Sequence, residues 1–382
     1  MRASVATALA LLASCYGPTV QAGLPCSELG ECPPGQLCDR GVCVTTPRPD
    51  DASADLDAAT DAGVDAATLI DAPSGVLAWI EATALPSARS LMCLATFNGR
   101  LYATGGSFQT VPKVDVLIAP ILPNGLLGAW TAAPDLPMAT RWHGCAVDPT
   151  NPSLYVVGGD NGTTGRDVVY RAAIDATSGA LGAWVVQAPL PAGRRGLGVV
   201  WDAGQLYAIG GEEADNFMVR DTVFRAATGP TGLATSGWTT TTGLFPADYA
   251  FGTALAGGGI YLTGGYQGNA AVRGSTIGAG GALGPFLTTT ALPGPRERHV
   301  SVSDGTYVYA IGGEPNFGGA NLDSAYRAPI TATGSLGAWS ALPVLPLKLA
   351  YSSAVFVSGR IYVAGGSEGT VQTARVFILQ GL

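Results

Sequence analysis

Tyr102-Ala-Thr-Gly105-Gly106 is the first of six copies of one motif, Tyr-x-x-Gly-Gly. The copies are Tyr102–Gly106, Tyr155–Gly159, Tyr207–Gly211, Tyr261–Gly265, Tyr309–Gly313 and Tyr362–Gly366. Their first glycines are separated by 53, 52, 54, 48 and 53 residues. A repeat of this length predicts an array of small sheets, one for each copy.

Two further features recur with the motif. A Leu-Pro or Phe-Pro dipeptide precedes each copy, at Pro86, Pro137, Pro191, Pro246, Pro293 and Pro346. An aromatic residue precedes each dipeptide, at Trp79, Trp130, Trp184, Trp238, Phe286 and Trp339. In the first repeat we expect four strands, a to d, over 92–97, 100–104, 114–119 and 127–131, with a type I′ turn at Asn98-Gly99 between a and b.

The ends of the repeat region predict a closed ring. The last repeat supplies strands a, b and c, with c at 376–379, and the chain then stops. The first aromatic, Trp79, lies in an apolar stretch at 76–80 that has no strands a to c before it. We therefore expect 76–80 to form strand d of the last sheet, which removes a free sheet edge. The fold class is all-β, a six-bladed β-propeller over 76–382.

The repeat resembles the kelch repeat, in which a diglycine closes one strand and a Tyr and a spaced Trp accompany it. The resemblance covers 76–382 and implies a kelch-type propeller closed by an N-terminal strand. Two departures are that Phe286 replaces the Trp and that the segment 247–252 lacks the basic residue found in other repeats.

The first residues have the features of an export signal. Arg2 is followed by a short apolar run, so 1–14 is predicted to be a signal peptide. Leu12-Ala13-Ser14-Cys15 resembles a bacterial lipobox, which implies lipidation of Cys15 and an outer-membrane lipoprotein; ordinary cleavage after Ala22, giving a secreted protein, is the alternative. The lipid would be the only membrane contact.

A cysteine-rich segment and a linker follow, at 15–47 and 48–75. The segment contains Cys26, Cys32, Cys38 and Cys43, for which export favours disulfides over zinc. It is similar to small cysteine modules in surface proteins of myxobacteria-like organisms. The linker holds seven Asp against one Arg, which predicts a disordered, self-repelling tether.

The net charge of −8 therefore belongs mainly to the linker. The remaining chain has no basic patch, and we expect no nucleic-acid partner. No phosphate-binding loop, nucleophile elbow or metal-binding helix is present, so no cofactor or metal is expected.

Arginines after the repeated prolines are the first candidates for a ligand site. The d–a and b–c loops should share one face, and the candidate ligand-binding residues there are Arg89, Arg141, Trp142, His143, Arg194 and Arg296. One hypothesis is that the arginines pair with carboxylates and tie blades together. The other is that several converge on the channel mouth and bind an anionic group. Nearby Phe217, Tyr266 and Phe317 could stack on a sugar or peptide.

Two cysteines remain in the repeat region. Cys93 and Cys145 each lie four residues after an arginine, Arg89 and Arg141, and are interpreted as equivalent positions in adjacent blades. Core packing and a disulfide both remain open, because the spacing of strands around a channel can exceed the reach of about 7 Å between Cα atoms.

Three enzyme families were weighed. Galactose-oxidase-like copper sites and sialidase-like sites require motifs that this chain lacks. Sialic-acid mutarotase propellers are a closer architectural match and imply a site at Arg296, Glu297, Arg298 and His299, with Glu297 as acid/base. Since no complete catalytic set is present, we expect a non-catalytic protein- or glycan-binding module, with a mutarotase-like epimerase as the alternative.

Overall fold

The computed structural model describes residues 37–39, 42–44 and 76–382, apart from 214, 242 and 244. The predicted signal peptide, Cys15, Cys26, Cys32 and the linker lie outside the described residues. Within the cysteine-rich segment, β1 (Leu37–Asp39) and β2 (Val42–Val44) form an antiparallel pair in which Cys38 is opposite Cys43.

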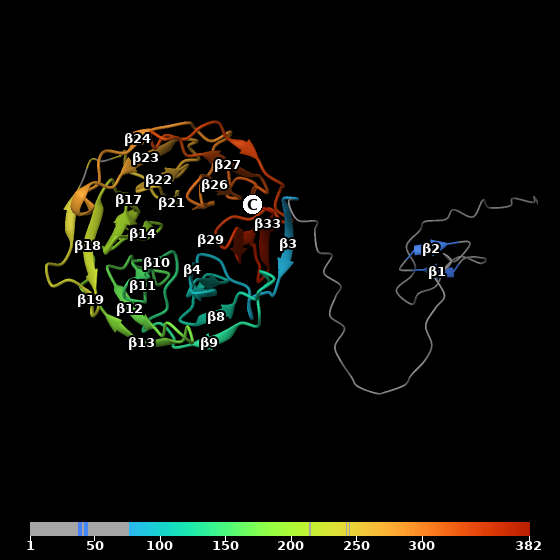
Figure 1. Cartoon of the computed structure of the whole chain (residues 1–382), viewed down its shortest axis with the longest axis horizontal. Coiled ribbons are helices and arrows are strands. Elements are labelled where there is room, and N and C mark those ends of the chain that lie inside the picture. Colours follow the sequence, from blue (N-terminus) through green and yellow to red (C-terminus); the bar gives the residue numbers. More distant parts are fainter. Residues whose placement is uncertain (1–36, 40–41, 45–75, 214, 242, 244) are drawn as a thin grey trace, which may run out of the picture. The chain divides into compact units, whose positions relative to one another are not determined.

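The residues from 76 onward form six antiparallel sheets, the blades of a β-propeller (Figure 1), which confirms the predicted fold class. Blade 1 consists of β4 (Cys93–Phe97), β5 (Arg100–Thr104), β8 (Val116–Pro120) and β9 (Thr131–Ala133). Blade 2 consists of β10 (Gly144–Asp148), β11 (Ser153–Val157), β12 (Val169–Ile174) and β13 (Leu181–Val186). Blade 3 consists of β14 (Gly198–Asp202), β15 (Gln205–Ile209), β18 (Val223–Gly229), β19 (Gly232–Leu233) and β20 (Thr239–Thr241).

Blades 4 to 6 complete the ring. Blade 4 consists of β21 (Gly252–Ala256), β22 (Gly259–Thr263), β23 (Val272–Thr276) and β24 (Leu287–Thr288), with a short 3-10 helix at Ala279–Gly281. Blade 5 consists of β25 (Val300–Ser303), β26 (Tyr307–Ile311), β27 (Ala325–Pro329) and β28 (Ser340–Ala341). Blade 6 consists of β29 (Ser353–Val357), β30 (Arg360–Ala364), β33 (Val376–Gln380) and β3 (Ala78–Ala82).

The ring closes as predicted, because the outer strand of blade 6 comes from the start of the repeat region. β3 pairs with β33 from Ala78 opposite Gln380 to Ala82 opposite Val376. The expected position of strand d in blade 1 was wrong: it begins at Thr131 and not at Leu127. The reason is a longer c–d turn, in which Leu127 bridges back to Ile121 and is buried.

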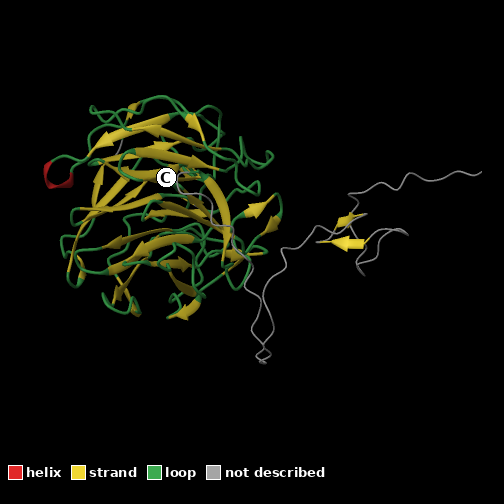
Figure 2. Ribbon diagram, turned by 45° about the vertical axis from the view of Figure 1, so that its right-hand side comes forward, coloured by secondary structure: helices red, strands yellow, loops and turns green. Residues whose placement is uncertain are grey.

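The hydrophobic core is divided among the six junctions between blades. Each cluster of buried apolar residues combines two neighbouring sheets; one, for example, joins Leu94 and Leu101 of blade 1 to Tyr362 and Ile378 of blade 6. The inner strands β4, β10, β14, β21, β25 and β29 contact one another in a closed circle around the central channel, which Figure 1 views end-on. Figure 2 shows the same blades turned by 45°, built almost entirely of strands and loops.

The motif tyrosine fastens a blade to the next one at four of the six junctions. Four of the six donate a hydrogen bond to a glycine carbonyl in the c–d turn of the following blade: Tyr102 to Gly179 (2.9 Å), Tyr207 to Gly281 (2.8 Å), Tyr261 to Gly334 (2.8 Å) and Tyr362 to Gly125 (2.7 Å). At these four junctions the tyrosine supplies a buried donor; the Tyr309 hydroxyl instead donates to Asp304 of its own blade, and the Tyr155 hydroxyl has no partner among the described residues.

The repeated tryptophan makes the opposite connection. Its indole N–H donates to a carbonyl oxygen of the preceding blade: Trp79 to Pro343, Trp130 to Thr83, Trp184 to Pro134, Trp238 to Ala188 and Trp339 to Thr290. Phe286, which has no N–H, packs edge-on against Phe245 instead, with ring centroids 5.3 Å apart.

The diglycine lets the backbones of adjacent blades touch. Gly105 has a φ of +53°, and a Cβ atom there would lie 2.4 Å from the carbonyl oxygen of Thr140 in the next blade. The second glycine of every motif donates its N–H across the junction: Gly106 to Thr140, Gly159 to Arg194, Gly211 to Asp248, Gly265 to Arg296, Gly313 to Leu349 and Gly366 to Arg89, at 2.7–3.0 Å. Glycine is required because any side chain would collide with the neighbouring carbonyl.

Candidate functional site at the channel mouth

The d–a and b–c loops lie together on one face of the propeller, called the site face below. Backbone bridges join the two loops within a blade at Ser90 and Ser107, Arg141 and Asp160, Arg195 and Glu212, Glu297 and Glu314, and Ala350 and Ser367. Three b–c loops carry small hairpins: β6 (Ser107–Phe108) with β7 (Val111–Pro112), β16 (Glu212–Glu213) with β17 (Met218–Val219), and β31 (Ser367–Glu368) with β32 (Val371–Gln372).

A closed ring of backbone hydrogen bonds shapes the channel mouth on this face. One residue per blade donates its N–H to the carbonyl oxygen of its counterpart in the preceding blade, at 2.8–3.0 Å. The six residues, called the mouth ring, are Leu91, Trp142, Gly196, Ala250, Arg298 and Tyr351. All have φ between 54° and 59°, so five non-glycine residues hold a strained left-handed conformation.

A cavity of about 220 Å³ occupies this end of the channel. Each blade contributes four consecutive residues to its wall, starting with its mouth-ring residue: 91–94, 142–145, 196–199, 250–253, 298–301 and 351–354. The cavity is therefore framed by inner strands, and its chemistry depends on which side chains the ring residues carry.

Three of the candidate arginines do not reach the cavity. Arg89, Arg194 and Arg296 are buried within the blades. Arg89 pairs with Asp115, and Arg194 pairs with Glu213 at 2.8 Å. Arg296 donates to the carbonyl oxygens of Gly312 (3.0 Å) and Ser324 (3.3 Å), and burial lowers its pKa. Two of the three arginines thus pair with carboxylates, as one hypothesis expected, but the partners of all three lie within the same blade, so these side chains do not tie blade to blade.

Two other arginines tie the loops of blades 2 and 3. Arg141 Nε contacts Asp160 Oδ1 at 2.7 Å, and Arg195 Nη1 contacts Asp160 Oδ2 at 3.3 Å. Arg195 Nη2 also contacts Glu212 Oε2 at 2.6 Å. Asp160 is thus shared by guanidinium groups from both blades. Of the arginines after the prolines, only Arg298 lines the cavity.

Arg298 forms a buried network with two carboxylates. Its Nη1 contacts Glu297 and Glu314, and Tyr351 Oη lies 3.2 Å from Glu314 Oε1. Burial raises the pKa of Glu297, which the Arg298 charge opposes. Glu297 and Arg298, two residues of the epimerase hypothesis, are therefore bonded to each other.

Both histidines lie between blades. His143 Nε2 is 2.8 Å from Thr104 Oγ1 of blade 1, and His299 Nε2 is 2.8 Å from Thr263 Oγ1 of blade 4. Both imidazoles are buried, and burial lowers their pKa, for His143 to about 4. Each ring thus fastens its blade to the preceding one as a neutral group.

An aromatic and guanidinium stack crosses the channel mouth. The Arg195 guanidinium carbon is 5.6 Å from the ring centre of Phe217 and 5.2 Å from that of Trp142. The Arg298 carbon is 5.9 Å from the Trp142 ring and 4.8 Å from the Phe317 ring. These geometries are cation–π contacts. The stack ends in two exposed rings, since Phe217 and Phe317 are 67% and 74% accessible.

More exposed apolar side chains lie on the b–c loops of the same face. We call the set the crown; its members are Phe108, Val111, Phe217, Met218, Tyr266, Phe317 and Val371. Sequence reasoning found Phe217, Tyr266 and Phe317 but missed the others. The signal that could have found them is the presence of large apolar residues in loops that are otherwise Gly-rich and polar.

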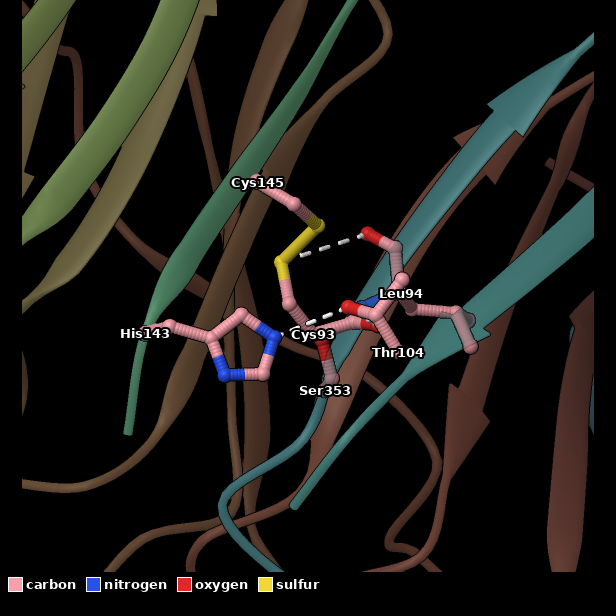
Figure 3. The surroundings of a disulfide bond; sticks show 6 residues. All are labelled: Cys93, Leu94, Thr104, His143, Cys145 and Ser353. Carbon is pink, nitrogen blue, oxygen red and sulfur yellow. Dashed lines mark hydrogen bonds between the residues drawn. A yellow bond between two sulfur atoms is a disulfide. The ribbon is translucent and has the colours of Figure 1, made fainter. Parts of the chain in front are cut away.

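Cys93 and Cys145 form a disulfide in the cavity wall, between β4 and β10 (Figure 3). Their Cα atoms are 5.9 Å apart, within the reach of a disulfide bond. The structure thus decides between the two open readings of this pair. The same close approach occurs at other junctions, where a Cβ on Gly144 would meet Val199 and one on Gly198 would meet Thr253.

The interpretation of the two cysteines as equivalent was wrong. Cys93 is opposite Thr104, directly before the diglycine, whereas Gly144 holds that place in blade 2 and Cys145 comes one residue later. Successive side chains of a strand point to opposite faces. The shift of one residue therefore directs Cys93 toward blade 2 and Cys145 toward blade 1, which equivalent positions could not do.

Comparison with the models of known protein families and with curated proteins gave no match for this chain. Within the described residues, no group of three or more His, Cys, Asp or Glu side chains is arranged to hold a metal ion. Nor does the described part of the chain contain a helix long and apolar enough to span a membrane.

Proposed function

We propose that this chain is a non-catalytic binding or scaffold module that holds a protein ligand on the site face. The observation that carries the proposal is the crown: seven exposed large apolar side chains lie on the b–c loops of the site face, and two of them, Phe217 and Phe317, end the stack at the channel mouth. Exposed apolar clusters of this kind mark interaction sites, and loops on a rigid scaffold are where binding residues concentrate.

The charges at the mouth support a protein ligand over a small anion. Arg141, Arg195 and Arg298 are each already paired with carboxylates of this chain. An anion would have to break those pairs. Aromatic and arginine side chains at the centre, with aliphatic ones such as Val111 and Met218 around them, match the composition of protein interfaces.

The course of the chain supports a tethered module. β3 runs from Ala78 to Ala82 and leads into a d–a loop, so the propeller begins at Val76 on the face opposite the crown. A tether attached there leaves the site face unobstructed.

We further propose a kelch-type repeat in a lipidated, exported chain of the envelope. The Cys93–Cys145 disulfide supports export, because such bonds persist in oxidising compartments.

Site-specific photo-crosslinking of the full chain in the producing cell tests the binding proposal. A photo-reactive amino acid replaces Val111 or Val371 on the crown, or Val186 on the outer strand β13 as a control; these side chains are similarly exposed, at 65%, 68% and 67%. A discrete protein adduct should form from both crown positions and not from the control, and the purified partner should bind the purified chain.

Two results would count against the proposal. A carbohydrate adduct from the crown would make the ligand a glycan. Equal labelling from the crown and from Val186 would mean that the crown is not a binding surface.

A further inference from the structure

We infer that the channel mouth receives a basic side chain, lysine or arginine, from the protein partner, beside apolar side chains that rest on the crown. The inference rests on the proposed protein-binding function and specifies the chemistry of the partner. Three observations carry it: the balance of charge at the mouth, the position of the excess charge, and the aromatic groups beside it.

The ion-pair network at the mouth holds one carboxylate more than it holds guanidinium groups. Three guanidinium groups, those of Arg141, Arg195 and Arg298, face four carboxylates, those of Asp160, Glu212, Glu297 and Glu314. All four carboxylates are largely or fully buried. A buried charge without a counterion is costly, so a cation supplied by the partner is favoured at this place.

The excess charge lies on the blade 5 side. Arg195 uses separate nitrogens for its two carboxylates, contacting Asp160 with Nη1 and Glu212 with Nη2. Arg298, in contrast, meets both Glu297 and Glu314 with the single nitrogen Nη1. One guanidinium thus balances two carboxylates there.

Blade 4 supplies no charge at this level of the ring. Between the repeated proline and the mouth ring, its d–a loop is one residue shorter than in the other blades: Ala250 comes four residues after Pro246, whereas Trp142, for example, comes five after Pro137. Tyr249 therefore stands where blades 3 and 5 carry Arg195 and Glu297. Burial first, and then the charge of Glu212, raises the pKa of Tyr249 to about 12.

Aromatic rings flank this uncharged position. The Tyr249 ring centre is 4.8 Å from that of Tyr266 and 5.9 Å from that of Trp142. Carboxylates next to aromatic faces are the groups that recognise ammonium and guanidinium ions. The surrounding crown adds contacts for apolar neighbours of that cation, which points to a peptide segment with Lys or Arg beside Leu, Met or an aromatic residue.

Selection from phage-displayed random dodecapeptides on the immobilised full chain tests the inference. Peptides that combine an apolar residue with an adjacent Lys or Arg should be enriched. Their affinity should fall about tenfold or more on Glu297→Gln and on Glu314→Gln, which remove the excess charge. Glu368→Gln, a charge change at an exposed b–c position of blade 6, should leave the affinity unchanged. Circular dichroism checks the folding of each variant.

The outcomes separate this inference from the proposed function. Peptides without a basic residue that bind Glu297→Gln and the native chain equally, but lose binding on a Phe217→Ser/Phe317→Ser variant, would overturn the inference and leave the protein-binding proposal standing. Failure to enrich any peptide, or enrichment that the double variant does not affect, would overturn both.

Discussion

Trp142 and Arg298 belong to blades that face each other across the channel, yet the Arg298 guanidinium carbon lies only 5.9 Å from the centre of the Trp142 ring. Both are mouth-ring residues with left-handed backbone conformations. The strained conformation is held by hydrogen bonds to neighbouring blades, and it directs two large side chains over the opening. The site face is therefore centred on a preorganised aromatic and guanidinium cluster.

Removing the Cys93–Cys145 disulfide should destabilise the propeller. The bond spans 52 residues of sequence, so the chain-entropy model gives a loss of about 4 kcal/mol in the free energy of unfolding for Cys93→Ser/Cys145→Ser. Urea denaturation followed by tryptophan fluorescence measures the change. A loss below about 1 kcal/mol would show that the packing of blades 1 and 2 already constrains this segment.

Alanine at Gly105 should be far more damaging than alanine at Gly99. Both glycines have positive φ, +53° and +69°, but only Gly105 faces a carbonyl oxygen, 2.4 Å from the expected Cβ. Gly99→Ala introduces only backbone strain, which should lower the free energy of unfolding by about 1–2 kcal/mol. Gly105→Ala adds a clash between blades, for a total of about 3 kcal/mol or more. Thermal unfolding of the two variants measures the difference. Equal losses of stability would mean that the diglycine is not required for the contact between blades.

Removing the hydroxyl of a motif tyrosine should destabilise the propeller where that hydroxyl joins two blades. Tyr102→Phe removes a buried hydrogen bond to Gly179 and should cost about 1–2 kcal/mol of stability. Tyr155→Phe is the matched control, because its buried hydroxyl has no hydrogen-bond partner among the described residues. Chemical denaturation of both variants should therefore separate them, and a larger loss for Tyr155→Phe would contradict the assignment.

The two buried histidines and Asp248 should together make stability rise with pH between about 4 and 6, against an opposing contribution from Glu297, whose pKa burial also raises. The pKa of buried His143 is about 4 against 6.5 when unfolded, and that of His299 is also lowered by burial, so the unfolded chain binds two protons that the folded chain does not. Burial raises the pKa of Asp248 to about 6 from 3.8, so the folded chain retains one proton that the unfolded chain loses. For these groups the net difference is one proton, or about 1.4 kcal/mol per pH unit.

The Asp248→Asn variant isolates the contribution of the two histidines to the pH dependence of stability. It removes the opposing proton, so the slope from these groups should double to about 2.7 kcal/mol per pH unit. Urea unfolding at several pH values between 4.5 and 5.5 measures both slopes. An unchanged slope in the variant would mean that Asp248 is ionised in the folded chain throughout this range.

Cys15→Ser should release the chain from membranes if Cys15 carries a lipid. The expected result is a shift of the full chain from the membrane fraction to the soluble fraction after cell fractionation, with the propeller still folded. Cys26→Ser is the matched control, since it removes a cysteine outside the lipobox. Continued membrane association of Cys15→Ser would favour cleavage after Ala22 or another attachment.

The fold was readable from the sequence because its determinants repeat. The diglycine makes the same contact at all six junctions, the tryptophan at five and the tyrosine at four, so the copies specify six blades, and the unmatched Trp79 specifies the closing strand. Asn98 and Gly99 both have positive φ, as the type I′ prediction requires. The length of the c–d turn was harder to predict, because no residue near Leu127 indicates that it belongs to a turn and not to a strand.

The site was less predictable because it depends on single-residue offsets. Arg194 and Arg195 are neighbours, yet the first is buried inside blade 3 and the second reaches the channel mouth. Aligning repeats on their arginines likewise misplaced Cys145 by one residue. The Phe217-to-Phe317 stack joins loops of three blades, and no local pattern encodes contacts between such distant segments.

The pairing of β3 with β33 has a consequence for how the protein is made. The strand that completes blade 6 is the first of the propeller to leave the ribosome, and its partner β33 (Val376–Gln380) is the last propeller strand in the described part of the chain. Five blades can assemble during synthesis while the edge of β3 still lacks its partner strand, β33. Loss of β33 would therefore leave an open arc, and the unpaired edge of β3 is open to aggregation until β33 has been made.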